Sequence, residues 1–310
     1  MSVLVGIVSR NRSEILPKAI ESALLQDYSP LQVSVFDDNS SDDTVDLEEK
    51  YPHVSWEFSK ENKGYLYARN NFMRETSANY FCSLDDDSWF LEPSTLKSAI
   101  HYLESHPLTA AIAFDILSPD RPVGLPESLP FEVANFIGCG HVLRMSAVRE
   151  VGYYDPNPSF YGGEEKDLCI KLINKGYEIA LMPGKYVWHD KTNIARDESK
   201  QHSSGVCNDL VFAYRRLPLL FLFPGLFFKV MSHLRFGVSF RKGAFFFAGL
   251  LGIVKFFALL LSFSIKRKAV SIIAFKKYRG LINEEHVKVN QLMQRDHVTR
   301  TSRTNEYDSK

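Results

Sequence analysis

The first 85 residues alternate between apolar runs and segments with helical spacing, and this alternation constrains the fold more than any other feature of the chain. Residues 3–8 form a continuous apolar run, which is typical of a parallel strand buried on both faces. In the helical segment that follows, Ser13 is the expected N-cap and Pro17 stands in the first turn, where proline is tolerated. Further strands are expected at residues 31–36, near 54–58 and just before residue 85, with a helix over about 65–76. Such alternation predicts a doubly wound α/β sheet.

Three carboxylates, Asp85, Asp86 and Asp87, follow directly on the last of these strands. Packed like charges are unfavourable unless a positive group lies beside them, and oxygen ligands suit hard cations such as Mg²⁺ or Mn²⁺, which bind phosphates. A water-exposed acidic turn is the alternative that the triplet alone would favour. However, residues 37–43 form an acidic segment after the second strand, and ligands bind beyond the carboxyl ends of parallel strands in such sheets. We therefore expect these segments to converge on one ligand site.

Six short segments, taken in order, resemble the family 2 glycosyltransferases with the GT-A fold. They are Val-Ser-Arg-Asn-Arg at 8–12, Asp-Asp-Asn-Ser-Ser at 37–41, Asn-Lys-Gly at 62–64 leading to Ala-Arg-Asn at 68–70, the aspartate triplet at 85–87, Gly-Gly-Glu-Glu at 162–165 and Val-Trp-His at 187–189. Each segment is weak alone, but their order and spacing over roughly residues 3–195 are specific. The resemblance implies a nucleotide-binding, Rossmann-like mixed sheet and points to bacterial polysaccharide enzymes that transfer rhamnose, galactose or N-acetylglucosamine. The chain has no G-x-G-x-x-G or Walker A motif, which disfavours a dehydrogenase or a P-loop enzyme.

The resemblance also implies a metal site. Asp87 matches the residue that coordinates the metal ion bound to the donor diphosphate, and Asp85 and Asp86 are implied to help bind ribose, metal or sugar. His189 matches a metal ligand of some members, and an imidazole among oxygen ligands favours Mn²⁺ over Mg²⁺. The alternatives are a solvated strand-end charge for Asp87 and a purely structural histidine.

A nucleotide-sugar site is implied by the same comparison. Asp38 matches the carboxylate that reads uracil or thymine through the ring N3–H, and its alternative is an ordinary Asx turn. Ser9, Arg10 and Asn11 are expected in this site, with Arg10 standing where members often stack an aromatic residue on the base. A guanidinium plane can stack in the same way, but this departure leaves the base open. Arg69 is expected to reach the diphosphate or, alternatively, to be a solvated helix arginine.

The general base of the resembled enzymes falls on Glu165, with Glu164 as the second candidate, because the family more often has Asp at this position. The glycines before them permit close backbone approach, and the positive end of a helix dipole would keep a carboxylate there ionised. The dipole alone also explains acidic residues in a first helical turn, which is the structural alternative.

Charge divides the chain into two regions. Residues 1–210 carry 19 Lys and Arg against 32 Asp and Glu, whereas residues 211–310 carry 18 against 5. The acidic region can bind metal and nucleotide, and the basic region is expected to meet an anionic membrane surface. No signal-peptide pattern follows Met1, and the four cysteines lack metal-site spacing, so a cytoplasmic catalytic part with reduced thiols is expected.

Two apolar segments follow in the basic region. Residues 217–228 read as too short and too interrupted by proline to span a membrane, whereas 244–265 has the length of a spanning helix, about 20 residues. Lys255 in its middle favours helices that lie in the cytoplasmic leaflet, because the lysine then reaches the surface. A single span and a buried helix pair are the alternatives. The expected domains are a GT-A catalytic domain at 1–205, a membrane-associating helical region at 206–293 and a disordered polar tail at 294–310.

The predicted function is metal-dependent, inverting transfer of a hexose or deoxyhexose from a UDP- or dTDP-sugar to a lipid-linked or surface polysaccharide acceptor. The protein is expected at the cytoplasmic face of the cell membrane, peripheral or monotopic, without a nucleic-acid partner. One alternative is a nucleotidyltransferase, which would need a Gly-rich loop and a lysine after the first strand. The other is an inactive nucleotide-sugar-binding module. The sugar, the base and the acceptor are left open.

Overall fold

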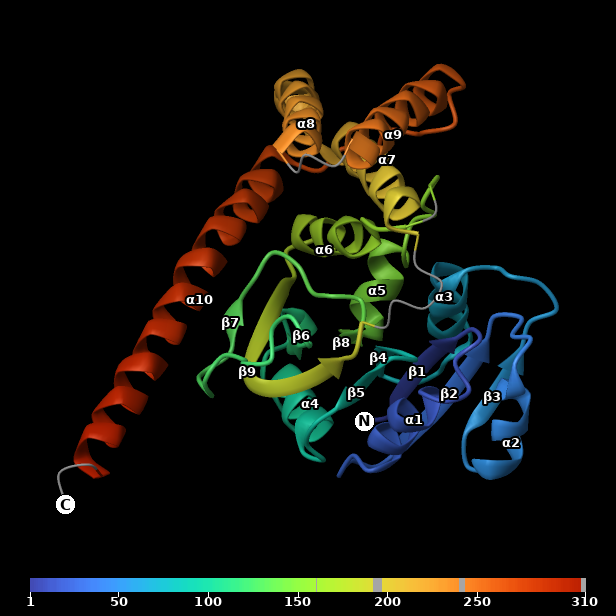
Figure 1. Ribbon diagram of the computed structural model, residues 1–310, viewed down its shortest axis with the longest axis vertical. Helices are drawn as coiled ribbons and strands as arrows, with labels where there is room; N and C mark the ends of the chain where they lie inside the picture. Colours follow the sequence, from blue (N-terminus) through green and yellow to red (C-terminus); the bar gives the residue numbers. More distant parts are fainter. Residues whose placement is uncertain (160, 192–196, 240–242, 308–310) are drawn as a thin grey trace. The chain divides into compact units, whose positions relative to one another are not determined.

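The computed structural model describes residues 1–159, 161–191, 197–239 and 243–307 (Figure 1). The chain divides into two compact units. The sheet unit comprises Met1–Tyr153, Tyr177–Thr192 and Arg279–Lys310, and the helical unit comprises Tyr154–Gly176 and Asn193–Tyr278. This division differs from the predicted boundaries at 205 and 293, because residues 154–176 belong to the same unit as the C-terminal helices.

The sheet unit is built on one mixed sheet, as predicted (Figure 1). Its described strands are β1 (Val3–Ser9), β2 (Leu31–Asp37), β3 (Ser55–Phe58), β4 (Tyr80–Asp85), β5 (Ser88–Phe90), β6 (Thr109–Leu117), β7 (Phe131–Glu132), β8 (Gly140–Arg144) and β9 (Glu178–His189). The strand order is β3-β2-β1-β4-β8-β6-β9-β5, and β7 pairs with β9. β1, β2, β3 and β4 are parallel, whereas β8 runs antiparallel between β4 and β6. β6 pairs in parallel with β9, and β5 and β7 are antiparallel to it.

The strand register aligns the carboxyl ends of the parallel strands at one edge of the sheet. Ser9 at the end of β1 pairs with Asp37 at the end of β2, and Val8 pairs with Asp85 at the end of β4. The segments that follow these three strands therefore leave the sheet at one edge, which is where a doubly wound sheet binds its ligands.

Two antiparallel pairings bring later residues to the same edge. Gly140 at the start of β8 pairs with Leu84, so Cys139 just before it lies near the end of β4. His189 at the end of β9 pairs with Ser88 of β5, directly after the aspartate triplet. Long-range pairing thus places a histidine and a cysteine beside the carboxylates.

Four helices of the sheet unit pack on the strands and bury apolar residues: α1 (Leu16–Leu24), α3 (Tyr65–Glu75), α4 (Thr95–Ser105) and α5 (Met145–Val151). The short α2 (Leu47–Lys50) has no buried residue and follows a 3₁₀ turn at Asp43–Asp46. Leu16 and Ile20 of α1 are fully buried. Pro17 lies in the first turn, as expected, but the expected N-cap is wrong: Ile15 precedes the helix without a side-chain cap. Ser13 instead donates its backbone N–H to Asp42, at 2.9 Å.

The helical unit contains α6 (Glu164–Asn174), α7 (Glu198–Arg216), α8 (Leu219–Ser239) and α9 (Gly243–Leu261). α6 begins at Glu164, as predicted, and Gly176 follows it with φ 90°. α7 packs against both α8 and α9. Its buried residues, among them Val206, Cys207 and Leu210, form an apolar core with Ile253 and Phe256 of α9.

The apolar helices differ from the prediction. α8 continues through Pro224 for 21 residues, so the expectation of a short, interrupted segment is wrong. A proline inside a helix removes one backbone hydrogen bond and its ring crowds the preceding turn, but here the helix extends on both sides of it. α9 ends at Leu261 rather than residue 265, because Phe263 adopts φ 54° and Ser264 donates its N–H to the Leu259 carbonyl, which closes the helix. By length and composition, Leu219–Phe236 and Gly243–Leu261 could each cross a membrane.

Part of the polar tail predicted at residues 294–310 is described as helix. α10 (Ile272–Tyr307) starts in the helical unit and continues as helix through Tyr307. The sequence has no proline or glycine after Gly280, and these are the two residues that most disfavour a helix interior. Neither therefore interrupts the second part of α10.

Candidate active site

The turn after β2 is held by its own carboxylates. Asp37 is buried and accepts hydrogen bonds from the backbone N–H and the hydroxyl of Ser40. Asp38 is 4% exposed, and its two oxygens accept the backbone N–H groups of Lys63 (2.7 Å) and Gly64 (2.9 Å) from the loop before α3. A carboxylate has about four acceptor positions, so Asp38 keeps capacity for a further N–H donor.

The turn after β1 contains one structural residue and one unsatisfied hydroxyl. Asn11, at φ 54°, donates its N–H to Ser40 Oγ (2.8 Å) and accepts the N–H of Ser41 (2.7 Å), so it ties the two turns together. Ser9 is 1% exposed, and its hydroxyl has no hydrogen-bond partner among the described residues. The side chain of Arg10 is exposed. Ser9 and Arg10 therefore have groups left for a ligand, whereas the backbone N–H and Oδ1 of Asn11 bind the neighbouring turn.

Arg69 of α3 is part of the same edge. Its side chain is 3% exposed and lies 2.5 Å from Asp85 Oδ1, with the guanidinium over the Tyr65 ring at 5.0 Å. The alternative of a solvated helix arginine is therefore wrong. Ser88, one residue after the triplet, fixes the turn: its hydroxyl accepts the Asp85 N–H (2.8 Å) and donates to the Cys139 carbonyl (2.9 Å).

The middle carboxyl of the triplet shows the repulsion that the sequence predicts. Burial, together with the adjacent Asp87 and Asp85 carboxylates, raises the pKa of Asp86 to about 7. The Arg12 guanidinium and a hydrogen bond from the Arg10 backbone N–H (3.2 Å) act in the opposite direction. At Asp86, burial and the two neighbouring carboxylates therefore outweigh the Arg12 charge and this hydrogen bond.

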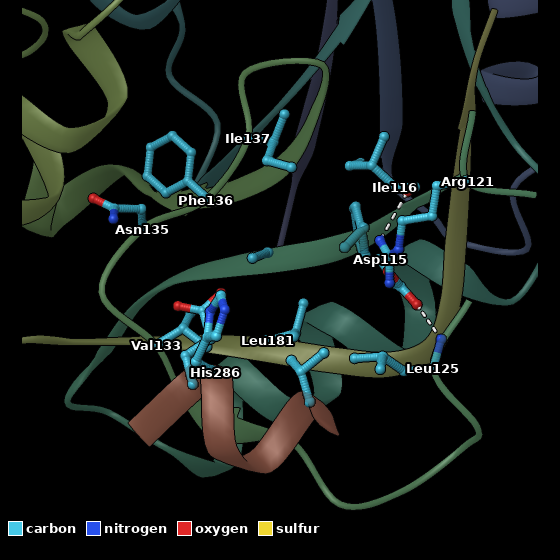
Figure 2. Close-up of a pocket in the computed structure, with 14 residues that line it drawn as sticks. Asp115, Ile116, Arg121, Leu125, Val133, Asn135, Phe136, Ile137, Leu181 and His286 are labelled. Carbon is cyan, nitrogen blue, oxygen red and sulfur yellow. Dashed lines mark hydrogen bonds and ion pairs between the residues drawn. The ribbon is translucent and has the colours of Figure 1, made fainter. Parts of the chain in front are cut away.

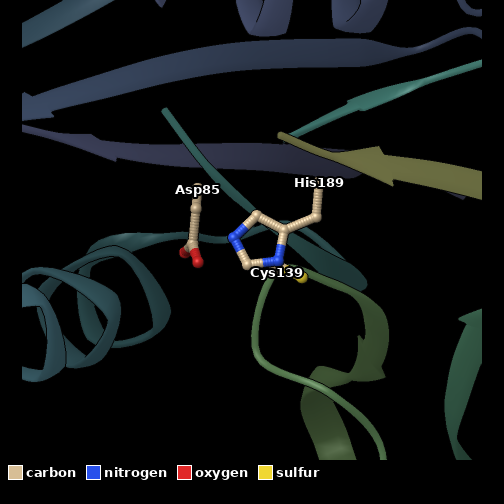
Figure 3. Close-up of side chains that lie close together, drawn as sticks. All are labelled: Asp85, Cys139 and His189. Atoms are coloured by element: carbon tan, nitrogen blue, oxygen red, sulfur yellow. The ribbon is translucent and has the colours of Figure 1, made fainter. Parts of the chain in front are cut away.

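Asp87 and His189 lie together at the centre of this edge. Asp87 is 3% exposed, and its Oδ1 lies 3.2 Å from Nε2 of His189. Figure 3 shows the His189 ring beside Asp85 and Cys139, and the three ligand atoms lie within 4.8 Å of one another, close enough to hold one metal ion. Carboxylate oxygens and an imidazole fit Mn²⁺ or Mg²⁺, whereas a thiol is a soft ligand. Of these three residues, Asp85 and His189 offer the ligand atoms that suit a hard cation, and Asp87 lies beside His189.

The helical unit carries the two base candidates at the start of α6, and it distinguishes them. Glu164 is 3% exposed and accepts a hydrogen bond from Asn157 Nδ2 at 2.8 Å. Glu165 is partly exposed. Both follow Gly162 and Gly163, which adopt φ 86° and 100°. The buried carboxylate is used within the unit, and the neighbouring one is accessible to solvent.

The sheet unit also has a cavity of about 240 Å³ on the face of β6 and β9, lined in part by α10 (Figure 2). Its main charged groups pair with each other: Arg121 contacts Asp115 at 2.7 Å, and Asp115 accepts the Leu125 N–H. Arg121 also donates to the Ile116 carbonyl at 3.0 Å. The residues predicted from sequence do not line this cavity.

Two family models match overlapping parts of the chain. Residues 4–152 match the model of glycosyl transferase family 2, and residues 127–264 match that of glycosyl transferase family group 2. The UDP-Glc:alpha-D-GlcNAc-diphosphoundecaprenol beta-1,3-glucosyltransferase WfaP of Escherichia coli is 30% identical over 185 residues, which cover 56% of this chain and 71% of that protein. The glucosyl-dolichyl phosphate glucuronosyltransferase of Haloferax volcanii is 28% identical over 205 residues, 56% of this chain and 64% of that enzyme.

Solved structures show the same fold at low sequence identity. The crystal structure of S. aureus TarS 1-349 in complex with UDP-GlcNAc matches with a TM-score of 0.61 and 16% identity, over 78% of this chain and 76% of that one. The mannosyltransferase PcManGT from Pyrobaculum calidifontis, in complex with GDP-Man and Mn²⁺, matches with a TM-score of 0.56 and 16% identity, over 91% and 83%. The chain belongs to the family 2 glycosyltransferases, and its sheet has the GT-A fold. It spans less than two thirds of the length of the Haloferax enzyme.

Two residues at the carboxyl edge of the sheet were not predicted from the sequence. Ser88 directly follows the triplet, and its position in a tight turn could have been noticed. Cys139 has no local signal, because only the long-range pairing of β8 with β4 brings it there.

Proposed function

We propose that this protein is an inverting, metal-dependent glycosyltransferase that moves a sugar from a UDP- or dTDP-sugar to a hydroxyl of a lipid-linked or polysaccharide acceptor. The observation that carries the proposal is the convergence of Asp38, the aspartate triplet and His189 at the carboxyl edge of one GT-A sheet. A nucleotide needs a base-reading acceptor, and its diphosphate needs a cation; the edge offers groups for both.

For the nucleotide-sugar donor, the residues that can still form hydrogen bonds define the nucleotide site. Asp38 accepts the N3–H of a pyrimidine base while the backbone of Lys63 and Gly64 holds it in place. The buried hydroxyl of Ser9 gains the partner that it lacks when a ligand is bound. Arg10 stacks on the base or contacts phosphate from the exposed side. Arg69 orients Asp85 through their ion pair.

Asp85, Asp87 and His189 are the proposed ligands of a divalent cation. The raised pKa of Asp86 supports this assignment, because burial and the neighbouring carboxylates both disfavour a further negative charge at this edge. A divalent cation held there would neutralise the negative charge of the departing diphosphate. Two relatives by fold were crystallised with Mn²⁺, PcManGT and GalNAc-T7, which supports the choice of ion.

Glu165 is the proposed general base, which takes the proton of the acceptor hydroxyl as that oxygen displaces the nucleoside diphosphate. Its partial exposure and its place in the first turn of a helix suit a carboxylate that stays ionised and meets a substrate. Glu164 is buried against Asn157 and is assigned a structural role. Direct attack from the side opposite the leaving group inverts the anomeric centre.

The acceptor class is inferred from relatives. The names of the Haloferax and E. coli enzymes state a dolichyl phosphate and a diphosphoundecaprenol acceptor, and another relative is a poly-beta-1,6-N-acetyl-D-glucosamine synthase of Staphylococcus aureus. A lipid-linked acceptor agrees with an apolar surface on this chain. α8 exposes Phe223, Phe227 and Phe228, and α9 exposes Phe247 and Phe257.

We further propose that α8 and α9 lie in the cytoplasmic interface of the membrane rather than span it. α9 packs along α7, whose Ser203 carbonyl approaches Gly252 closely. α7 carries Glu198, Lys200 and Asp209, which a hydrocarbon core would strongly disfavour. In the interface, the polar helix faces water and the exposed apolar side chains of α8 and α9 face lipid.

The test of the proposed function is a transfer assay on the purified full chain with a panel of nucleotide sugars and Mn²⁺. We expect turnover with at least one UDP- or dTDP-sugar, loss of turnover in excess EDTA, and loss in Asp87→Asn. The exposed acid Asp43 serves as a control, and Asp43→Asn should keep full activity. Full activity in EDTA would rule out the metal role. Binding of a nucleotide sugar without transfer or hydrolysis would favour the inactive binding module.

A further inference from the structure

One side chain of α7 holds the loop that leads into α6. Asn208 is 2% exposed, and its Nδ2 lies within hydrogen-bond distance of the carbonyls of Ser159 (3.0 Å), Tyr161 (3.0 Å) and Gly162 (2.9 Å). Its Oδ1 accepts the Ser159 N–H at 3.2 Å. The Nδ2 and Oδ1 atoms of the amide are thus both hydrogen-bonded to the backbone of a loop that lies nearly fifty positions earlier in the chain.

This loop needs such a partner because it has no regular secondary structure of its own. Gly162 and Gly163 adopt the left-handed region, and Gly163, the N-cap residue of α6, offers no side-chain cap. No side chain therefore caps the first N–H groups of α6 at this position. Asn208 serves the carbonyl side of the loop instead, because its amide donates and accepts as a peptide group does, and Asn157 Nδ2 also donates to the Gly162 carbonyl at 3.4 Å.

The same loop ends at the proposed base. Gly162 is three residues before Glu165, and a Cβ built on Gly163 would lie 3.5 Å from Cβ of Asn208, in ordinary contact. Asn157, at the other end of the loop, donates to Glu164. The direction in which the first turn of α6 leaves the loop is consequently fixed from two sides, by Asn157 and by Asn208.

We infer that Asn208 is a positioning residue for transfer: it sets the conformation of the glycine pair and so the placement of the Glu165 carboxylate. This role rests on the proposed function of Glu165 as general base. Asn208 does not touch the reacting atoms. A catalytic group displaced by about 1 Å can cost roughly 100-fold in rate, so loss of the amide should reduce turnover far more than donor binding.

The experiment compares Asn208→Ala and Asn208→Asp with Val206→Ala in the full chain. Val206 is on the same helix and equally buried, but it packs in the core with α9. We expect both Asn208 variants to lower kcat by about 10- to 100-fold with the donor KM changed less than about 3-fold. Asn208→Asp keeps the size and the acceptor but loses the donated bonds, so it should not rescue activity. Val206→Ala should lower the melting temperature and keep kcat.

Amide hydrogen exchange of residues 157–165 gives a second readout that does not depend on activity. Asn208→Ala should speed exchange in this segment, and Val206→Ala should not. If Asn208→Ala keeps kcat within 2-fold, or if it leaves the exchange of the segment unchanged, the inference is wrong. If Val206→Ala lowers kcat as much, the effect is general destabilisation, and the inference is equally wrong.

A Glu165→Gln variant separates this inference from the proposed function. Full activity in Glu165→Gln would show that the base assignment fails, and Asn208 would then no longer position a base, whatever the exchange data show. An inactive Glu165→Gln beside a fully active Asn208→Ala would overturn only the positioning role. Inactivity of Glu165→Gln with a kcat defect and faster exchange in Asn208→Ala supports both.

Discussion

The packing of α7 on α9 depends on one glycine, and this makes a sharp prediction about stability. A Cβ placed on Gly252 would lie 2.4 Å from the Ser203 carbonyl oxygen and 2.8 Å from Cβ of Val206. The nearest atom is backbone, so it moves only if the helices separate. Gly249, three residues earlier on the same helix and also buried, has its nearest neighbour at 3.5 Å, the His202 ring, which is ordinary contact.

The matched pair Gly252→Ala and Gly249→Ala isolates the cost of that clash. Both variants gain helix propensity of about 1 kcal/mol, because alanine replaces glycine in a helix interior. Gly252→Ala also overpacks the interface, which costs about 1–3 kcal/mol. The propensity gain cancels in the difference, so Gly252→Ala should be less stable than Gly249→Ala by about 1–3 kcal/mol, or roughly 2–12 °C in melting temperature.

The assay is thermal unfolding of both full-length variants in the same detergent, followed by circular dichroism. Gly249→Ala should match or exceed the wild type. Equal melting temperatures for the two variants, or a higher one for Gly252→Ala, would show that α7 and α9 do not approach each other as closely as the structure has them.

Three further predictions follow from the site and its surroundings. Glu165→Gln should lower turnover by about 100-fold or more and leave the melting temperature unchanged. Glu164→Gln should instead lower the stability by about 1 kcal/mol and keep turnover. Steady-state kinetics and thermal melts measure both effects, and the reverse pattern would mean that the two residues have exchanged roles. Burial lowers the pKa of Lys171 from 10.5 to about 8, so between these values the unfolded chain binds a proton that the folded chain does not. This group therefore makes stability rise with pH in that window, by up to about 1.4 kcal/mol per unit, and thermal melts at pH 8 and 9.5 should show a smaller rise in Lys171→Met. Phe223→Ser combined with Phe227→Ser should move the protein from the membrane pellet to the supernatant in sedimentation; unchanged pelleting would count against the lipid-facing role of α8.

The parts of the site that depend on strand ends were predictable from the sequence. A parallel strand buried on both faces reads as an apolar run, and its end is marked where the run meets polar residues, as before Asp37 and Asp85. Because parallel strands leave the sheet at one edge, the meeting of these segments follows from topology alone. His189 required the resemblance as well, since nothing in its local sequence says which strand β9 joins.

The rest could not be predicted, because it depends on long-range packing. Asn208 stands on a helix as an ordinary polar residue, and only the fold brings it to a loop 46 to 49 residues away. Ser13 has the right type for an N-cap, but it is hydrogen-bonded to Asp42 and the helix begins at Leu16, after Ile15. Pro224 reads as a helix breaker, yet the helix around it forms, since packing of α8 against α7 and α9 outweighs the loss of one hydrogen bond.

The division of charge at residue 210 does not coincide with the boundaries of the two units of the fold. The helical unit, residues 154–176 and 193–278, carries 17 Lys and Arg against 7 Asp and Glu, a net charge of +10. Three of the acids in this count pair with cations of the same unit: Arg216 binds Asp167 and Asp155, and Lys229 binds Asp209.

Those three acids lie before residue 211 and most of their partner cations after it, so a count split at that point separates the members of each pair. The cations held in these pairs are less available to anionic lipid than the sequence count implies. The exposed aromatic and aliphatic side chains of α8 and α9 add an apolar contribution to membrane affinity beside the remaining positive charge. High salt screens charges but leaves apolar burial intact, so it should release little of the protein, whereas detergent should release most of it.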